Sequence, residues 1–292
     1  MHDHSVFSFW AVLGESALDS LKVLPFLFLA FLFMEYLEHK AGDKFTALLR
    51  KTGGTKVAGP ALGALLGCIP QCGFSAAAAS LFAGRVISAG TLIAVFLATS
   101  DEAIPILLSN PGNLHTIWQL IAIKIIIAII FGTAISFVYA IFGKKSSDTD
   151  FEDLCRDCGC GEHGILRSAM RHTANIFAFI LIINILLGTI VGLIGEEAFF
   201  GFIESFGVFQ PAVAALVGLI PNCASSVFIT ELYIEGGLSF GSTVAGLCSG
   251  AGVGLMVLYK SNKHLKENII ITVLLYLIAV FCGVVINLAG GA

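Results

Sequence analysis

The sequence predicts an all-α integral membrane protein of two inverted repeats, each with three full transmembrane helices and one re-entrant helical hairpin. Three observations lead to this prediction: the composition, a duplicated segment and the distribution of basic residues. Of the 292 residues, 57% are hydrophobic and only 12% are charged, and the mean hydropathy is +0.93. Soluble domains carry about 25% charged residues, so the composition excludes an ordinary soluble protein.

A duplicated segment defines the repeats. The sequence ALGALLGCIPQCGFS at 61–75 returns as AVAALVGLIPNCASS at 212–226, at a constant offset of 151 residues. Without a gap, 61–94 and 212–245 agree at twelve of thirty-four positions, whereas unrelated apolar segments would agree at about a tenth. Such self-similarity indicates a duplicated unit.

Apolar stretches long enough to cross the ~30 Å hydrocarbon core as helices are the candidate spans. They lie near 21–39, 88–109, 116–142, 173–194, 239–259 and 268–289. Because residues 1–19 contain no Lys or Arg, we expect an amphipathic N-terminal segment and no cleavable signal. The expected organisation is a first repeat over 1–143, a cytoplasmic linker over 144–171 and a second repeat over 172–292.

Basic residues decide whether the duplicated segments, 57–84 and 208–234, cross the membrane. The linker after the first span and the central linker are both rich in Lys and Arg, and positive loops face the cytoplasm. A full crossing by 57–84 would place these linkers on opposite sides, so a re-entrant hairpin is favoured. The basic residues are Lys40, Lys44, Arg50, Lys51 and Lys56 in the first linker, and Lys144, Lys145, Arg156, Arg167 and Arg171 in the second.

This topology inverts the second repeat relative to the first and places both termini outside the cytoplasm. Inverted repeats with broken helices at the midplane are typical of secondary transporters. Irregular backbone at membrane depth survives only where it is buried or lines a cavity, so we expect the hairpin tips to form the substrate site. The alternative is that Pro70 and Pro221 only kink ordinary spans.

Each hairpin tip offers an amide, a thiol and hydroxyl groups. Polar groups inside membranes usually mark transport pathways, although small polar residues also pack between close helices and amides also join helices. We therefore expect these side chains to bind the substrate. They are Gln71, Cys72 and Ser75 in the first hairpin, and Asn222, Cys223, Ser225 and Ser226 in the second.

An acidic pair lies inside the span 88–109. Asp101 and Glu102 follow Thr99 and Ser100 in ATSDEAIP, and a carboxylate near the bilayer centre costs about 2.5 to 3.5 kcal/mol. Two such groups need cations, protons or polar partners, and their oxygens suit a divalent ion such as manganese. We predict Asp101 and Glu102 as metal ligands and Thr99 and Ser100 as substrate-binding residues; the alternative places the pair at the outer interface, solvated.

Two further polar residues lie in apolar spans. Lys124, in LIAIKIIIAII, is a candidate partner of the acidic pair and a coupling residue, or else its ammonium snorkels to the interface. Asn184, in ILIINILLG, either takes part in coupling or braces a helix contact.

The central linker contains a cluster of soft metal ligands. Its sequence CRDCGCGEH supplies a C-x2-C-x-C-x2-H pattern, which fits a thiophilic metal such as zinc or copper(I). A solvated loop with incidental cysteines is the alternative. The four ligands would be Cys155, Cys158, Cys160 and His163.

The motifs GCIPQCGFS, ATSDEAIP, IPNCASS and LCSGAGVGL resemble those of the ten-span heavy-metal exporters, labelled arsenic efflux proteins or manganese transporters. The resemblance covers about 18–288 and implies metal efflux. Carried over by motif, it points to Gln71, Cys72, Asp101, Glu102, Asn222 and Cys223. Arsenite would use the thiols, whereas manganese would use the oxygen ligands.

The function predicted is a secondary transporter of the plasma (cell inner) membrane that exports a divalent heavy-metal ion, with manganese favoured, by proton-coupled antiport and alternating access. The alternatives are export of arsenite, an organoarsenical or a small organic solute, and an intramembrane metal-dependent enzyme or sensor. No Walker A or HExxH motif is present, so we expect neither an ATPase nor an enzyme. The expected partners are the metal or arsenical, protons, lipid and a possible second copy, with no cofactor and no nucleic acid.

Overall fold

Helices make up all the regular structure in the described part of the chain. The computed structural model describes 55–68, 72–99, 103–109, 114–142, 207–221 and 223–290, with single helical positions between 14 and 32 and between 170 and 189. The predicted spans 21–39 and 173–194 therefore lie largely outside the described residues. The helices are α3 (Ala58–Gly67), α4 (Cys72–Ala83), α5 (Ala89–Ala98), α6 (Ala103–Ser109), α7 (Leu114–Phe142), α11 (Gln210–Gly218), α12 (Cys223–Ile234), α13 (Phe240–Ser249), α14 (Val253–Ser261) and α15 (Leu265–Gly290).

Residues 151 positions apart adopt the same local structure. The Ser88 hydroxyl caps α5 by accepting a hydrogen bond from the Thr91 N–H, and the Ser239 hydroxyl caps α13 in the same way. The turns that precede these caps contain a left-handed residue at matching positions, Arg85 (φ 58°) and Gly236 (φ 83°). Serine at an N-cap satisfies an amide that the helix leaves free, so the same signals start the same helices twice.

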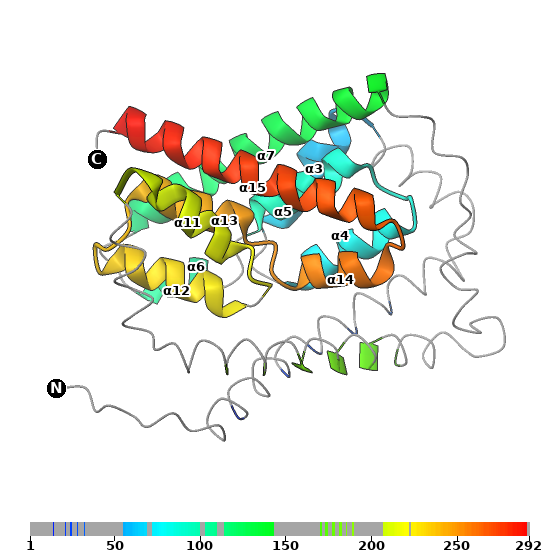
Figure 1. Ribbon diagram of the computed structural model, residues 1–292, viewed down its shortest axis with the longest axis horizontal. Coiled ribbons are helices and arrows are strands. Elements are labelled where there is room, and N and C mark those ends of the chain that lie inside the picture. The colour runs from blue at the N-terminus through cyan, green and yellow to red at the C-terminus, as the bar shows by residue number, and fades with distance from the viewer. Residues whose placement is uncertain are drawn as a thin grey trace.

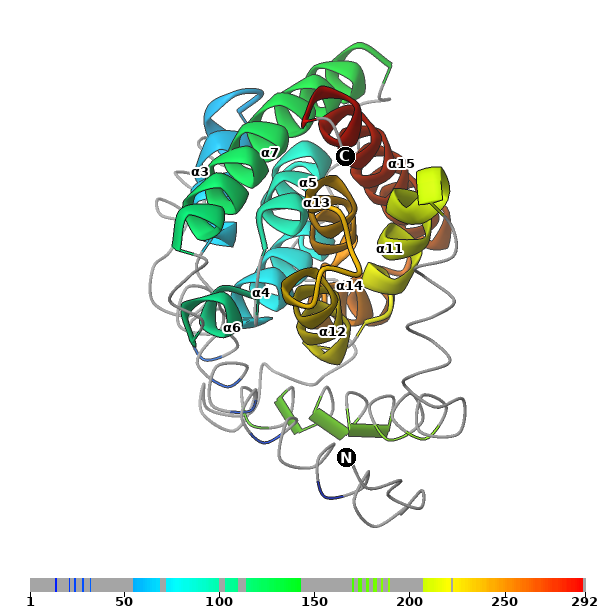
Figure 2. The same cartoon turned by 90° about the vertical axis from the view of Figure 1, so that its left-hand side faces the viewer.

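The two halves also pack their helices in the same pairs. In the first half α5 packs on α3 and α7, and in the second half α13 packs on α11 and α15. Figure 2 shows α5 and α13 side by side at the centre, with α3 and α7 on one flank and α11 and α15 on the other. Glycines allow these close approaches: a Cβ on Gly90 would lie 2.3 Å from the Gly132 carbonyl oxygen, and one on Gly241 would lie 2.4 Å from that of Gly283.

The second helix of each half packs on a helix of the other half. Helix α4 packs chiefly on α14, and α12 contacts α6, so Figure 1 shows α4 with α14 towards one end of the body and α12 with α6 towards the other. The limbs of each predicted hairpin, α3 with α4 and α11 with α12, make fewer contacts with each other than with other helices. Gly254 of α14 lies so close to Ser75 of α4 that a Cβ at Gly254 would be 2.8 Å from the Ser75 Cβ.

The predicted spans 88–109 and 239–259 are each two helices. Helix α5 ends at Ala98 and α6 starts at Ala103; α13 ends at Ser249 and α14 starts at Val253. Gly252 has φ 49°, a conformation that side-chain-bearing residues rarely adopt. By length and composition alone, His115–Ile141, Phe240–Ser261 and Leu265–Gly290 could cross a membrane among the described residues, but the second of these is interrupted at 250–252.

Burial distinguishes the central helices from the peripheral ones. Every residue of α5 is buried, as expected of a helix that is apolar on all sides. By contrast, α7 exposes Ile126 and Ile130, and α15 exposes Leu277 and Phe281. In a membrane protein such apolar faces contact lipid, so α7 and α15 form part of the lipid-facing surface.

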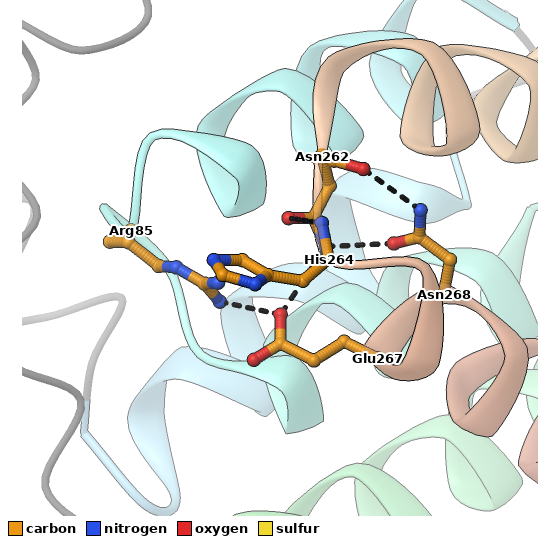
Figure 3. Close-up of polar contacts among 5 residues, drawn as sticks. All are labelled: Arg85, Asn262, His264, Glu267 and Asn268. Atoms are coloured by element: carbon orange, nitrogen blue, oxygen red, sulfur yellow. Dashed lines mark hydrogen bonds and ion pairs between the residues drawn. The ribbon is translucent and has the colours of Figure 1, made fainter.

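An ion pair joins the two halves at one end of the body (Figure 3). The Arg85 Nη1 atom, after α4, lies 2.8 Å from Oε2 of Glu267 in α15. The turn between α14 and α15 is held beside it: Asn262 donates to the Asn268 side-chain oxygen at 2.7 Å, and Asn268 donates back to the Asn262 carbonyl at 3.0 Å. These bonds fix the end of α4 against the start of α15.

Candidate functional site

The breaks of the two interrupted helices define the candidate site. In α13–α14 the break runs from Gly250 to Gly252, where the Ala251 N–H donates to the Ser249 carbonyl. In α5–α6 the helix is broken at the C-cap Thr99, whose ψ is 131°. Helix ends leave unpaired carbonyls and amides that carry partial charges of about half an elementary charge. In the described residues, the ends at these breaks are the C-terminus of α5, the C-terminus of α13 and the N-terminus of α14.

Lys124 of α7 bonds to both interrupted helices. Its side chain is 0% exposed, and its ammonium donates to the carbonyl oxygens of Thr99 and of Leu247, the latter at 2.7 Å. The snorkelling alternative for Lys124 is therefore wrong, because the ammonium is enclosed by protein. A buried ammonium needs strong acceptors, and carbonyls at the ends of helices supply them.

The Leu247 carbonyl is available because α13 stops. In a continued helix it would accept from the N–H of Ala251, but that N–H donates to Ser249 at 2.9 Å. The Thr99 carbonyl follows the last turn of α5, and the Thr99 N–H donates back to Val95 at 3.0 Å. Lys124 thus caps the C-termini of one helix from each half.

The hydroxyl groups near the site are held by main-chain carbonyls. The Thr99 hydroxyl donates to Val95 at 2.8 Å, and Ser225 donates to Ile220 at 3.2 Å. Ser75 is fully enclosed between α4 and α14, and Ser226 is buried in α12. These four predicted substrate-binding residues lie on α4, on α12 or at the end of α5.

The rest of the predicted site can be located only by its neighbours in the chain. Cys72 and Cys223 are the first residues of α4 and α12. Asp101 and Glu102 occupy the break between α5 and α6 in sequence. Among the described residues no group of three or more His, Cys, Asp or Glu side chains could hold a metal ion. Outside the described residues are Gln71, Ser100, Asp101, Glu102, Asn222 and Asn184, and the linker residues Cys155, Cys158, Cys160 and His163.

Sequence reasoning missed two thiols near Lys124. Cys68 follows α3 and is half-buried, while Cys248 lies in α13 and is buried. Cys248 directly follows Leu247, whose carbonyl oxygen accepts from Lys124, and Cys68 is the C-cap of α3, which packs on α7. The motifs GCIPQC and LCSG contain these cysteines, but only the packing brings them towards the same lysine.

Comparisons with known proteins give one family. The family described as "Putative, 10TM heavy-metal exporter" matches the chain over residues 12–206 and 193–292. No curated protein and no solved structure matches the chain significantly.

Proposed function

Because the chain belongs to this ten-span heavy-metal exporter family and is a multi-pass membrane protein, we propose that it is a secondary transporter that exports a divalent metal ion, with manganese favoured. Export is driven by proton antiport and proceeds by alternating access. The observation that carries the proposal is the pair of interrupted helices, α5–α6 and α13–α14, whose first halves end at a common ammonium. Broken helices of this kind bind ions in secondary transporters.

The metal ligands proposed are Asp101 and Glu102. They stand in sequence between Thr99, which Lys124 contacts, and Ala103, which starts α6. Asp101 and Glu102 follow Thr99 by two and three residues, and this closeness in sequence to a carbonyl that accepts from Lys124 supports a metal site near the contact between the halves. Gln71 and Asn222, next to the starts of α4 and α12, add oxygen ligands. Lys124 and Asn184 remain the proposed coupling residues, with Cys155, Cys158, Cys160 and His163 as a separate metal-binding linker.

Alternating access follows from the duplication. We propose that the two halves are inverted in the membrane, with the turn after α4 and the turn between α14 and α15 on the cytoplasmic face. Three observations support this orientation: the Arg85–Glu267 contact brings these turns together, Lys260, Lys263 and Lys266 surround the second turn, and basic loops face the cytoplasm. Both chain termini are then extracytoplasmic, and the central linker is cytoplasmic.

A second candidate function is export of arsenite or an organoarsenical. Thiols would be its ligands, and it is favoured by the positions of Cys72 and Cys223 at the starts of α4 and α12. In this case the carboxylates are dispensable for transport. The two candidates thus predict opposite effects on transport when the carboxylates or the thiols are replaced.

The test is uptake of radiolabelled manganese into inverted membrane vesicles, with zinc and arsenite as competitors. Native chain is compared with an Asp101→Asn plus Glu102→Gln variant and with a Cys72→Ser plus Cys223→Ser variant, all at matched expression. Manganese uptake that the first variant loses and the second retains supports the proposal. Arsenite uptake with the reverse pattern overturns it in favour of the thiol site.

A further inference from the structure

Lys124 is a buried cation whose role goes beyond holding one helix. Its ammonium belongs to α7, and among the described residues it donates to a carbonyl at the C-cap of α5 and to one in α13. These acceptors are 25 and 123 residues away in the chain, so one side chain connects both halves of the molecule. It is among the largest fully enclosed side chains in the described core.

The charge of the ammonium matches what the helix ends offer. Each helix C-terminus carries about half a negative charge, so two of them amount to about one. One ammonium therefore balances the ends of α5 and α13. A site of two inward-facing carbonyls without a cation would leave both desolvated, which is costly at membrane depth.

The duplication explains why only one of the halves supplies the lysine. The residue 151 positions after Lys124 is Leu275, which is fully buried in α15. Since α5 and α13 match each other under the same offset, a second ammonium from position 275 would be directed to the carbonyls of Phe96 and Gly250, near the ends of the same two helices. Two such charges would repel, so a duplicated fold can hold one lysine here and an apolar residue opposite.

We propose that Lys124 is a tethered cation filling a monovalent-cation site that the carbonyls of Thr99 and Leu247 form between the two halves. The site takes a primary ammonium because it offers directed acceptors in a buried position. The ammonium fastens α5 to α13 whenever both bonds are made.

In transport, this tether is a competitor of the exported ion. This step rests on the proposed function: a divalent cation bound at Asp101 and Glu102, two and three residues after Thr99, repels the ammonium and weakens the bond that joins the halves. Metal binding is then the event that frees the halves to move. Without metal, the tether holds them.

The direct test is chemical rescue of a Lys124→Ala variant. Thermal unfolding of the full chain in detergent is measured with propylammonium, which replaces the deleted atoms, and with tetramethylammonium at equal ionic strength, which has no N–H to donate. We expect Lys124→Ala to unfold several degrees below the native chain, and propylammonium to restore about half of that loss or more, at a few degrees per kcal/mol for a chain of this size. Tetramethylammonium restores none of it. The native chain and the control Lys260→Ala, which removes an exposed lysine of α14, show no difference between the two salts.

A second variant separates the loss of the charge from the loss of side-chain packing. Lys124→Met keeps an unbranched side chain that is one heavy atom shorter and removes the charge, so it should also unfold below the native chain. A Lys124→Met variant as stable as the native chain, or equal effects of the two salts on Lys124→Ala, overturns the proposal.

Manganese separates this inference from the proposed function. We expect Lys124→Met to bind manganese about tenfold more tightly or better than the native chain, because a repelling charge is gone. Rescue by propylammonium without any manganese binding would contradict the export proposal and leave the tethered-cation site standing. Manganese binding without rescue by propylammonium would overturn the tethered-cation site and leave the export proposal standing.

Discussion

Arg85 and Glu267 lie 2.8 Å apart, Nη1 to Oε2, although 182 residues separate them in the chain. Arg85 lies in the turn after α4 of the first half, and Glu267 lies in the first turn of α15 of the second. The pair thus joins the turn after α4 to α15, while α4 itself packs on α14, where Ser75 touches Gly254. Both side chains keep some exposure, 18% and 35%, so solvent weakens the attraction.

Removing this ion pair should cost little stability. Exposed ion pairs contribute about 0.2 to 1 kcal/mol, so a double-mutant cycle of Arg85→Gln and Glu267→Gln should give a coupling free energy in that range, and the coupling should fall with added salt. Thermal unfolding in detergent at two salt concentrations measures it. A coupling of several kcal/mol would mean that the pair is a buried clamp.

The backbone at Arg85 allows a sharper comparison. Its φ of 58° favours glycine, and the matching residue of the second half is Gly236. Arg85→Gly should therefore be more stable than Arg85→Ala, because both lose the ion pair but only alanine is strained by about 1 to 2 kcal/mol in this conformation. Equal stability of the two variants would show that this turn relaxes to a negative φ.

The contact between α4 and α14 should not tolerate a methyl group. A Cβ on Gly254 would lie 2.8 Å from both Ser75 Cβ and Phe96 Cε1, so Gly254→Ala should lower the free energy of unfolding by about 1 to 3 kcal/mol. Gly290→Ala is the matched control, because nothing lies within 4 Å of its Cβ position, and it should be neutral. Thermal unfolding compares the two; a neutral Gly254→Ala would show that α14 can move away from α4.

The glycine contacts of the two halves should respond alike. A Cβ on Gly90 would lie 2.1 Å from Oγ of Ser136, and a Cβ on Gly241 would lie 2.3 Å from Oδ1 of Asn287. Main-chain carbonyls stand as close in both cases, so neither neighbour can simply rotate away. Gly90→Ala and Gly241→Ala should both sharply reduce the yield of folded chain, as judged by size-exclusion chromatography. If alanine is tolerated in one half and not in the other, the tolerant half packs less tightly.

Thiol labelling should distinguish the cysteines near Lys124. Cys68 is half-buried, whereas Cys248 is fully buried. In single-cysteine chains in which the other seven cysteines are replaced by serine, a small maleimide should modify Cys68 faster than Cys248 by at least about tenfold, since fully buried thiols react only through local opening. Mass spectrometry of intact chains follows the reaction. Faster labelling of Cys248 would mean that α13 opens to solvent.

The sequence predicted the helical membrane class and the duplication because both depend on local composition. Pro70 and Pro221 mark the segments that the structure divides into α3 with α4 and α11 with α12. The interruption of 239–259 was not predicted from the sequence, because the mean hydropathy of the span hides the small residues Gly250 and Gly252. Nothing in the sequence other than the glycine itself indicates the positive φ of Gly252.

The candidate site was predictable only where it consists of unusual side chains. Lys124 is conspicuous as a charge in an apolar span, yet the acceptors that the described residues offer it are the main-chain carbonyls of Thr99 and Leu247, and every residue has such a carbonyl. These two carbonyls can accept from Lys124 because they lie at the ends of α5 and α13. The roles of Asp101 and Glu102 stay predictions, because both lie outside the described residues.

Proton-driven export is the central claim, and manganese flux under an imposed pH gradient tests it most directly. Inverted vesicles with an acidic interior should accumulate manganese above the external concentration, and a protonophore should release it. Vesicles with the Asp101→Asn plus Glu102→Gln variant should only equilibrate. Accumulation that is unchanged by the protonophore, or that the variant retains, would contradict the account.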